Sequence, residues 1–250
     1  MRNLILLISI FLFSINLQAS SIQSLDSANT AYKKGSFDKA VESYESILIE
    51  GFESAEVYYN LGNSYFKLRN YPKAILNFER AKLLNPEDED INYNLNLLNS
   101  YIVDKVTPLP EFIVYTWVKT IIHRFSVNEW SVFSLSFFSI SLLLFLFFLF
   151  SGISFLRKLF FWTGTVLLFL FIISTIFAFN SRSEIVNNHA AIITAGVTTA
   201  KSSPDYSSTD LFIIHEGTKV IINEELDEWT EIKLLDGSIG WIKSKDFEKI

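Results

Sequence analysis

The sequence predicts a multidomain membrane protein made of an all-α solenoid, a two-helix transmembrane hairpin and a small all-β barrel. Of its 24 phenylalanines, 14 lie between Trp130 and Asn180. Charge avoids that stretch: residues 21–107 hold 9 basic and 13 acidic residues, and residues 182–250 hold 7 and 12. The hydrophobic pattern has a helical period before the apolar block and alternates after it.

Composition also excludes several classes of function. The chain has no cysteine, which removes disulfides, thiolate nucleophiles and zinc-thiolate sites. Its net charge of −6 disfavours nucleic acid as a partner. The three histidines lie far apart and lack carboxylates at ligand spacing. We therefore predict no catalytic site, no metal site and no cofactor, and expect that the chain is not an enzyme.

A secretory signal peptide is predicted at residues 1–19. Arg2 supplies the positive start, and Leu4 to Ile15 form an apolar core of 12 residues. Ala19 is a small residue at a plausible cleavage point. The core is too short to span a bilayer.

Two longer apolar runs follow. The runs that end at Leu156 and Ser181 carry no charge over 27 and 23 residues, whereas about 20 suffice to cross the hydrocarbon core. We expect transmembrane helices at 130–152 and 159–180, with Arg157-Lys158 marking the turn. A basic turn agrees with the positive-inside rule. This predicts a protein of the cytoplasmic (inner) membrane whose two soluble domains are both periplasmic.

Residues 108–129 form the predicted linker before the first span. They include an apolar stretch from Phe112 to Phe125 with Tyr115 and Trp117. Two interpretations are open: an interfacial helix on the bilayer surface, or a helix packed on the preceding domain.

Residues 21–107 contain a repeat with a period of 34 residues. The second copy covers 55–88, a degenerate first copy covers 21–54, and 89–107 form a capping half-repeat. The second copy resembles the tetratricopeptide repeat family, whose signature spacing is met by Tyr58, Leu61, Gly62, Tyr65, Tyr71, Ala74, Phe78, Ala81 and Pro86.

This resemblance implies a groove lined by the first helix of each repeat, which binds a peptide or helix of a partner protein. The groove candidates are Asn29, Tyr59, Asn60, Asn63, Lys67, Tyr93 and Asn94. Asn29 is equivalent to Asn63, and Asn60 to Asn94. Amide side chains both donate and accept hydrogen bonds, which suits the backbone of an extended ligand. The alternative is that these asparagines are simply tolerated on a solvated helix face.

From residue 189 onward, short alternating apolar runs predict strands. They are expected at Ala190–Thr194, Leu211–His215, Lys219–Ile222, Trp229–Leu234 and Ser238–Ile242. Asp236-Gly237 favours a tight hairpin between the last two. The short strands predict a small closed barrel.

Residues 189–250 resemble a bacterial SH3 domain. The likeness is carried by Leu211, His215 to Thr218, Val220, Trp229, Ile232, Asp236-Gly237 and Gly240 to Ile242. Such domains commonly bind peptides, often those of the cell wall. The resemblance suggests a ligand face with Tyr206, Trp229 and Trp241, although Trp241 is alternatively a core residue.

The order of these segments resembles the BatE family of Bacteroides aerotolerance operon proteins. That resemblance implies partners among envelope or membrane proteins, including von Willebrand-type Bat proteins. The leading hypothesis is a non-enzymatic adaptor that is anchored in the lipid bilayer and assembles an envelope complex. The alternative hypothesis is a cell-wall sensor or anchor that binds peptidoglycan peptides.

Overall fold

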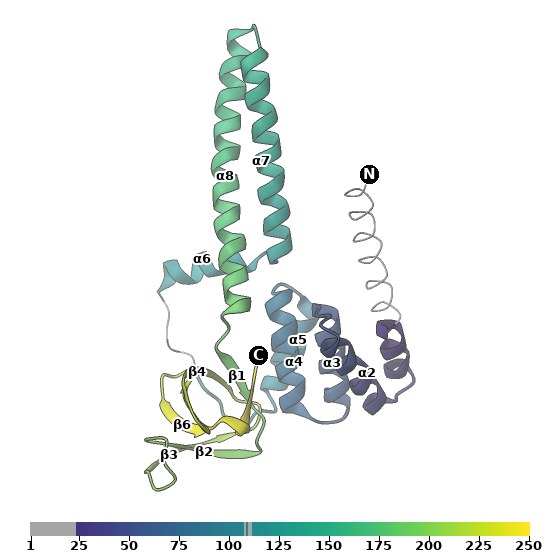
Figure 1. The fold of residues 1–250 in the computed structure, drawn as a ribbon, viewed down its shortest axis with the longest axis vertical. Helices are drawn as coiled ribbons and strands as arrows, with labels where there is room; N and C mark the ends of the chain where they lie inside the picture. Colours follow the sequence, from purple (N-terminus) through teal and green to yellow (C-terminus); the bar gives the residue numbers. More distant parts are fainter. Residues whose placement is uncertain (1–23, 108, 110–111) are drawn as a thin grey trace, which may run out of the picture. The chain divides into compact units, whose positions relative to one another are not determined.

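The computed structural model describes residues 24–107, 109 and 112–250 (Figure 1). The chain forms two compact units. One combines helices from the first part of the chain with the strands at residues 190–249. The other contains the apolar helices and the short helix before them. The predicted signal peptide lies outside the described residues.

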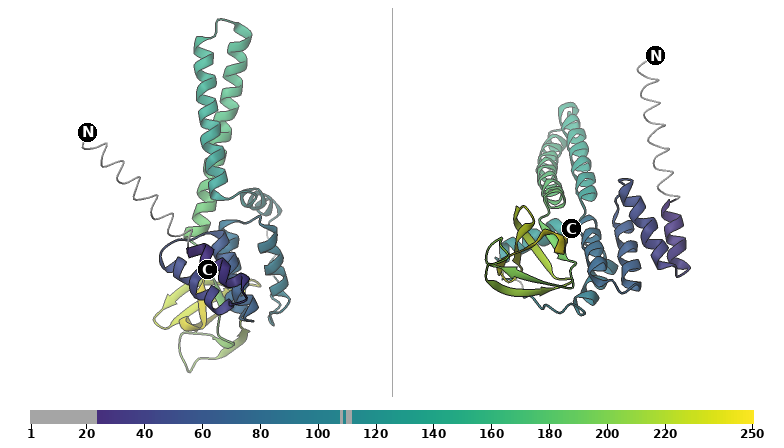
Figure 2. Two further views of the ribbon diagram at one scale, coloured as in Figure 1. Left: turned by 90° about the vertical axis from the view of Figure 1, so that its right-hand side faces the viewer. Right: turned by 60° about the horizontal axis from the view of Figure 1, so that its bottom comes forward.

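Helices joined by short turns form the repeat region (Figures 1 and 2). They are a helix over residues 24–33, α2 (Phe37–Ile49), α3 (Ala55–Lys67), α4 (Tyr71–Leu84) and α5 (Glu89–Asn99). Gly35 and Gly51 adopt positive φ angles of 75° and 83°, and each follows the end of a helix. Ser54 caps α3, because its hydroxyl oxygen accepts a hydrogen bond from the backbone N–H of Val57 at 3.2 Å. The predicted helical repeat region is confirmed.

Close packing between α3 and α4 explains the small residue of the repeat motif. Leu61, Ala74 and Phe78 are buried. A Cβ atom added at Gly62 would lie 2.9 Å from the ring of Phe78. The helices can therefore approach this closely only with glycine at position 62.

The apolar block forms two helices, α7 (Val127–Phe150) and α8 (Ser154–Val186), which are long and apolar enough to cross a membrane. The turn between them is not at Arg157 and Lys158 as predicted, but at residues 151–153. Arg157 and Lys158 already belong to α8. Arginine and lysine are good helix formers, whereas Gly152 is a poor one, so the break moves to the glycine.

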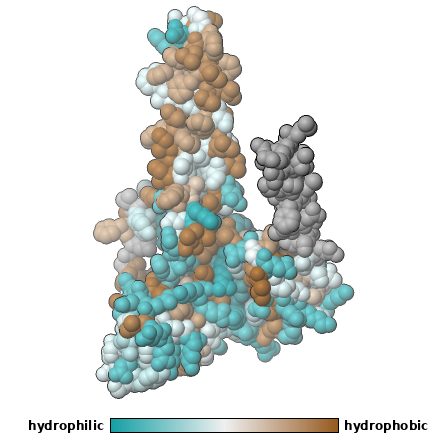
Figure 3. Space-filling view, in the orientation of Figure 1, coloured by the Kyte–Doolittle hydropathy of each residue, from teal (hydrophilic) through white to brown (hydrophobic). Residues whose placement is uncertain are grey.

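Small polar residues hold α7 against α8. The hydroxyl of Ser141 donates to the carbonyl of Gly164 at 2.8 Å, and the hydroxyls of Ser134 and Thr175 lie 2.8 Å apart. Small residues at such crossings allow two helices to approach closely. Aromatic rings also pair across the contact, among them those of Trp130 and Phe177 at 5.0 Å. Many other large apolar side chains are exposed, and hydrophobic surface covers much of the hairpin (Figure 3).

The short helix α6 (Ile113–His123) belongs to the same unit as the hairpin. The indole N–H of Trp130, near the start of α7, donates to the carbonyl of Ile122 at 2.9 Å. The side chains of α6 and the residue before it that are more than half exposed include Phe112, Ile113, Tyr115, Trp117 and Ile121.

Seven strands form one antiparallel sheet in the order β3-β2-β6-β5-β4-β1-β7. Their bounds are β1 (Ala190–Ile193), β2 (Val197–Lys201), β3 (Asp210–His215), β4 (Lys219–Leu226), β5 (Trp229–Leu234), β6 (Ile239–Lys243) and β7 (Phe247–Lys249). The Asp236-Gly237 hairpin is present between β5 and β6, whereas β2 and β7 were not predicted. Register shifts between β2 and β3 and between β4 and β5 accompany a strongly curled sheet (Figure 2).

The predicted closed SH3-like barrel is not observed, because β3 and β7, the two ends of the sheet, do not pair with each other. Both edges meet residues of the helical part instead. The carboxylate of Asp104 accepts a hydrogen bond from the backbone N–H of His215 in β3 at 2.7 Å. The guanidinium of Arg80 donates to the carbonyl of Lys249 in β7 at 2.5 Å. These contacts use backbone N–H and C=O groups at the edges of the sheet, which in a closed barrel would form hydrogen bonds between the two edge strands.

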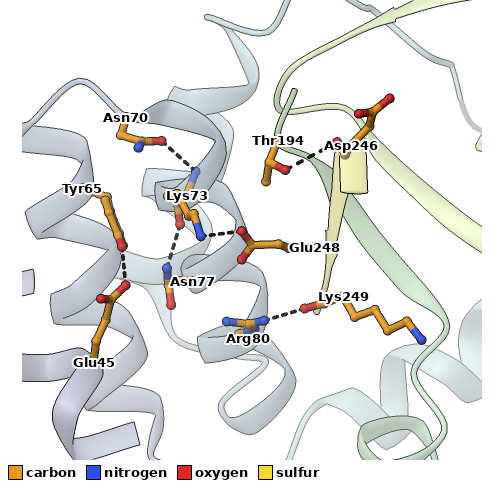
Figure 4. Close-up of polar contacts among 10 residues, drawn as sticks. All are labelled: Glu45, Tyr65, Asn70, Lys73, Asn77, Arg80, Thr194, Asp246, Glu248 and Lys249. Carbon is orange, nitrogen blue, oxygen red and sulfur yellow. Dashed lines mark hydrogen bonds and ion pairs between the residues drawn. The ribbon is translucent and has the colours of Figure 1, made fainter. Parts of the chain in front are cut away.

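Helix α4 and the sheet also share ion pairs, and Figure 4 shows the one between Lys73 and Glu248. Lys73 pairs with Glu248 of β7, and Glu79 lies 2.7 Å from the ammonium of Lys219 in β4. Gly217 packs so closely against this side that an added Cβ atom would lie 3.1 Å from Ile75. The repeats and the sheet therefore form one unit, which the sequence did not predict.

Asp104 joins the segment after α5 to the sheet. Besides the backbone N–H of His215, its carboxylate contacts the imidazole Nδ1 of His215 and the hydroxyl of Thr218, each at 2.8 Å. Burial acts to raise the pKa of Asp104, but these hydrogen bonds outweigh it and hold that pKa below its ordinary value of 3.8. The ionised carboxylate therefore stabilises this junction.

We expect Gly62→Ala to destabilise the protein by about 1 kcal/mol. Overpacking against Phe78 costs about 1–3 kcal/mol, which exceeds the gain of up to about 1 kcal/mol in helix propensity. Urea unfolding of the full chain in detergent, followed by circular dichroism, measures the change. Gly196→Ala is the control, because nothing lies within 4 Å of an added Cβ there. Equal midpoints for the two variants would contradict the packing argument.

We expect Asp104→Ala to cost about 1–3 kcal/mol at pH 7, because it leaves the N–H of His215 without its acceptor. The pKa of Asp104 is lowered in the folded state, so its stabilisation is full above the unfolded pKa and is lost as pH falls through the folded pKa. The difference from wild type should therefore shrink towards pH 3. Urea unfolding at pH 7, 5 and 3 measures it, with exposed Asp26→Asn as the control. A difference that does not change with pH would rule out this role.

Candidate functional site

The asparagines predicted for the groove lie together on the first helices of successive repeats. The amide nitrogen of Asn60 donates to the side-chain oxygen of Asn29 at 3.1 Å. The amide nitrogen of Asn94 donates to the side-chain oxygen of Asn63 at 3.3 Å and reaches the hydroxyl of Tyr59 at 3.4 Å. We call these four asparagines the amide ladder.

The ladder bonds join residues that are 31 apart, although equivalent positions in the repeats are 34 apart. The difference of 3 residues is close to one helical turn. Each asparagine therefore meets a residue about one turn earlier on the next first helix, and not its own equivalent.

The ladder keeps part of its hydrogen-bonding capacity. An asparagine side chain has two N–H donors and an oxygen that can accept twice. Among the described residues, no partner is seen for the side-chain oxygens of Asn60 and Asn94 or for the amide nitrogens of Asn29 and Asn63. All four side chains are only half-buried. They can offer both donors and acceptors to the backbone of an extended peptide.

Tyr44 supports the ladder from beneath. This fully buried residue donates its hydroxyl proton to the side-chain oxygen of Asn29 at 2.5 Å. Burial, with a smaller effect of the nearby Glu56 carboxylate, raises the pKa of Tyr44 to about 12. The hydroxyl therefore stays protonated at neutral pH and fixes the orientation of the Asn29 amide. Tyr44 was not among the predicted groove residues, and its equivalent in the next repeat is Phe78, which has no hydroxyl.

The remaining groove candidates differ in exposure. Tyr59 is half-buried, and its ring lies 5.7 Å from that of Phe78. Tyr93 is 68% exposed, and Lys67, in the last turn of α3, is also exposed. Tyr93 and Lys67 can therefore reach a partner without rearrangement, whereas Tyr59 chiefly positions Asn94.

The three residues predicted for the ligand face of the sheet do not form one platform. Trp229 is only 5% exposed, and its ring packs edge-on against Tyr206 at 5.3 Å. The hydroxyl of Tyr206 donates to Glu228 at 2.7 Å, and the ammonium of Lys243 lies 4.4 Å from the centre of its ring. Tyr206 therefore covers Trp229 and is itself held by two charged neighbours.

Trp241 belongs to a different part of the sheet. It is half-buried and pairs with Lys201 of β2, which places both side chains on one face. Strand alternation places four apolar side chains on the same face, and they are 45–60% exposed: Val197, Leu211, Ile213 and Ile239. That these four side chains share an exposed face was not predicted from the sequence. The sequence held no signal for this exposure, because the consecutive apolar positions of β3 are equally compatible with a strand that is covered on both faces.

Among the residues that the structure describes, no group of three or more histidines and carboxylates could hold a metal ion. His215 is bonded to Asp104, and His123 Nε2 lies 2.6 Å from the carboxylate of Glu184. Each imidazole therefore joins two segments of its own unit.

Comparison with known proteins identifies one segment. A family model of the tetratricopeptide repeat matches residues 55–88, which include α3 and α4. No curated protein matches the chain. Tetratricopeptide repeats are typical of adaptors that bind other proteins and lack catalytic activity, and this repeat carries Tyr59, Asn60, Asn63 and Lys67 of the predicted groove.

Proposed function

We propose that this chain is a membrane-anchored adaptor without catalytic activity of its own, which holds protein partners at the membrane surface. The observation that carries the proposal is the amide ladder on a tetratricopeptide repeat. Its unused donors and acceptors lie beside Tyr93 and Lys67, which are exposed. A partner peptide in extended conformation fits this chemistry, because its backbone presents one donor and one acceptor per residue.

The hairpin supports the anchoring. Helix α7 has 24 residues and α8 has 33, and exposed apolar side chains cover much of both. In water, so large an apolar surface would be strongly unfavourable. A lipid bilayer accommodates it, because the helices satisfy their own backbone hydrogen bonds. The exposed aromatic side chains of α6, Tyr115 and Trp117, suit the interface between lipid and water.

The contacts of α4 with the sheet support one further part of the proposal. Residues 24–109 precede the hairpin and residues 189–250 follow it, yet both contribute to the same compact unit. A chain that crosses the bilayer once between them would separate α4 from β4 and β7. The chain therefore crosses the bilayer an even number of times between them, so that both soluble parts lie on the same side. This fits two spans with both soluble parts periplasmic.

The kind of complex is the finer part of this proposal. The order of the segments resembles the BatE family, which favours an envelope complex with von Willebrand-type proteins of the aerotolerance operon. Recognition of peptidoglycan peptides is the weaker alternative, because Tyr206 and Trp229 are engaged with each other and Trp241 stands apart from them.

We expect thiol labelling to show both soluble parts on one side of the membrane. The chain has no cysteine, so single substitutions Lys33→Cys, Asp236→Cys and Lys158→Cys each give one reactive site. A membrane-impermeant maleimide added to intact spheroplasts should label the first two and label the third only after lysis. Labelling of Lys158→Cys before lysis would overturn the topology. A difference in labelling between Lys33→Cys and Asp236→Cys in intact spheroplasts would overturn it as well.

We expect a photo-crosslinking amino acid at Asn63 or at Tyr93 to capture the same partner protein in membranes of the native host. Glu42 on α2 is the matched control, because it is exposed but lies on the second helix of its repeat. Mass spectrometry identifies the captured proteins. Identical products from all three positions would show non-specific capture and count against the groove. Capture of a protein with a von Willebrand-type domain would support the Bat-type complex.

A further inference from the structure

A hollow of about 420 Å³ opens at the tip of the hairpin. It is lined by the end of α7 and the first turns of α8: Phe148, Ser154, Arg157, Lys158, Phe161 and Trp162. Two cations and one hydroxyl thus share a concave space with three aromatic rings. Figure 3 shows hydrophilic surface at this tip, in contrast to the hydrophobic surface along the hairpin.

The two cations at the tip lie apart from the acidic residues of the hairpin. Neither Arg157 nor Lys158 forms an ion pair with a carboxylate among the described residues. The sequence has no aspartate or glutamate between Glu129 and Glu184. Both of these lie at the far end of the hairpin, and the 24 residues of α7 alone rise by about 36 Å. The hollow therefore has a net positive charge that no carboxylate among the described residues neutralises.

Arg157 is partly positioned for a ligand. Its guanidinium carbon lies 5.4 Å from the centre of the Phe148 ring, a cation–π contact between α8 and α7. No hydrogen bond to the guanidinium is present among the described residues, so its N–H groups are available. The planar guanidinium matches two oxygens of a phosphate group at once.

This inference rests on the proposed function, since it requires the hairpin to cross a bilayer. A helix of about 20 residues spans the hydrocarbon core, so the tip of a longer helix lies at the depth of the lipid head groups. The anionic group present there is the lipid phosphate. Trp162, which is 66% exposed, has an amphipathic ring that suits the same depth.

We propose that the tip hollow binds the phosphate of an acidic glycerophospholipid. Arg157 and Lys158 neutralise the phosphate, and the hydroxyl of Ser154 donates a hydrogen bond. Phe148, Phe161 and Trp162 contact the upper part of the acyl chains. A zwitterionic lipid binds more weakly, because its ammonium group is brought close to two cations of the protein and finds no carboxylate.

Native mass spectrometry of the full chain in detergent tests the proposal with phosphatidylglycerol and phosphatidylcholine as probes. We expect wild type to retain one phosphatidylglycerol with a preference of roughly ten- to thirtyfold over phosphatidylcholine. The variant Arg157→Gln/Lys158→Gln should reduce that preference to about twofold or less. Lys119→Gln/Arg182→Gln removes the same charge elsewhere in the unit and should leave the preference unchanged.

Other results would contradict either the lipid site or the membrane anchor. Equal retention of both lipids by wild type, or equal loss of preference in both double variants, would overturn the site. Displacement of the lipid by an equal concentration of free glycerol 3-phosphate would show a simple phosphate site and also contradict a lipid site. Alkaline extraction of membranes tests the anchor separately: release of the chain refutes the spanning hairpin, whereas retention without a lipid preference refutes only the tip site.

Discussion

Helix α4 packs against α3 with one side and contacts the sheet with another, and this constraint determines the first unit. One side of the helix buries Ala74 and Phe78 against α3, where Gly62 allows the close approach. Another side presents Lys73, Glu79 and Arg80, which meet β7 and β4. The ion pairs are partly exposed, so each contributes little by itself. Their main effect is to fix which residues of α4 and the sheet face each other.

The repeat helices and the apolar helices could be predicted from the sequence, because residues close together in the chain specify them. The spacing of Gly62, Ala74 and Phe78 specifies a helix pair by itself, and uncharged runs of 23 and 27 residues specify the apolar helices. The position of the hairpin turn was wrong because charge received more weight than Gly152. The open sheet and the docking on α4 depend on Asp104 and Arg80, which lie more than 100 residues before the strands they contact. The hydrophobic periodicity of a sequence gives no information on contacts between residues so far apart in the chain.

For the candidate binding residues as well, the sequence predicted their positions on elements but not their contacts with distant residues. Repeat equivalence located the asparagines on the first helices, but it could not show that they bond to one another through a stagger of one turn. Tyr206 and Trp229 were both plausible ligand contacts as isolated aromatic residues. Only the folded loop shows that one covers the other. The exposed face of β2, β3 and β6 was missed, since an apolar strand looks alike whether its second face is covered or not.

The hairpin interrupts the first unit, and this has a consequence for the order of synthesis. Translation completes the repeats first, then the 79 residues from 110 to 188, and the strands last. Lys73, Glu79 and Arg80 therefore remain without their partners until the second apolar helix has been made and, in the topology proposed above, has returned the chain to its starting side. In that topology, insertion of only one of the two helices would leave α4 half-covered and the edges of the sheet unprotected. In the proposed topology, docking of the strands on α4 therefore requires that the chain does not stop after a single crossing of the bilayer.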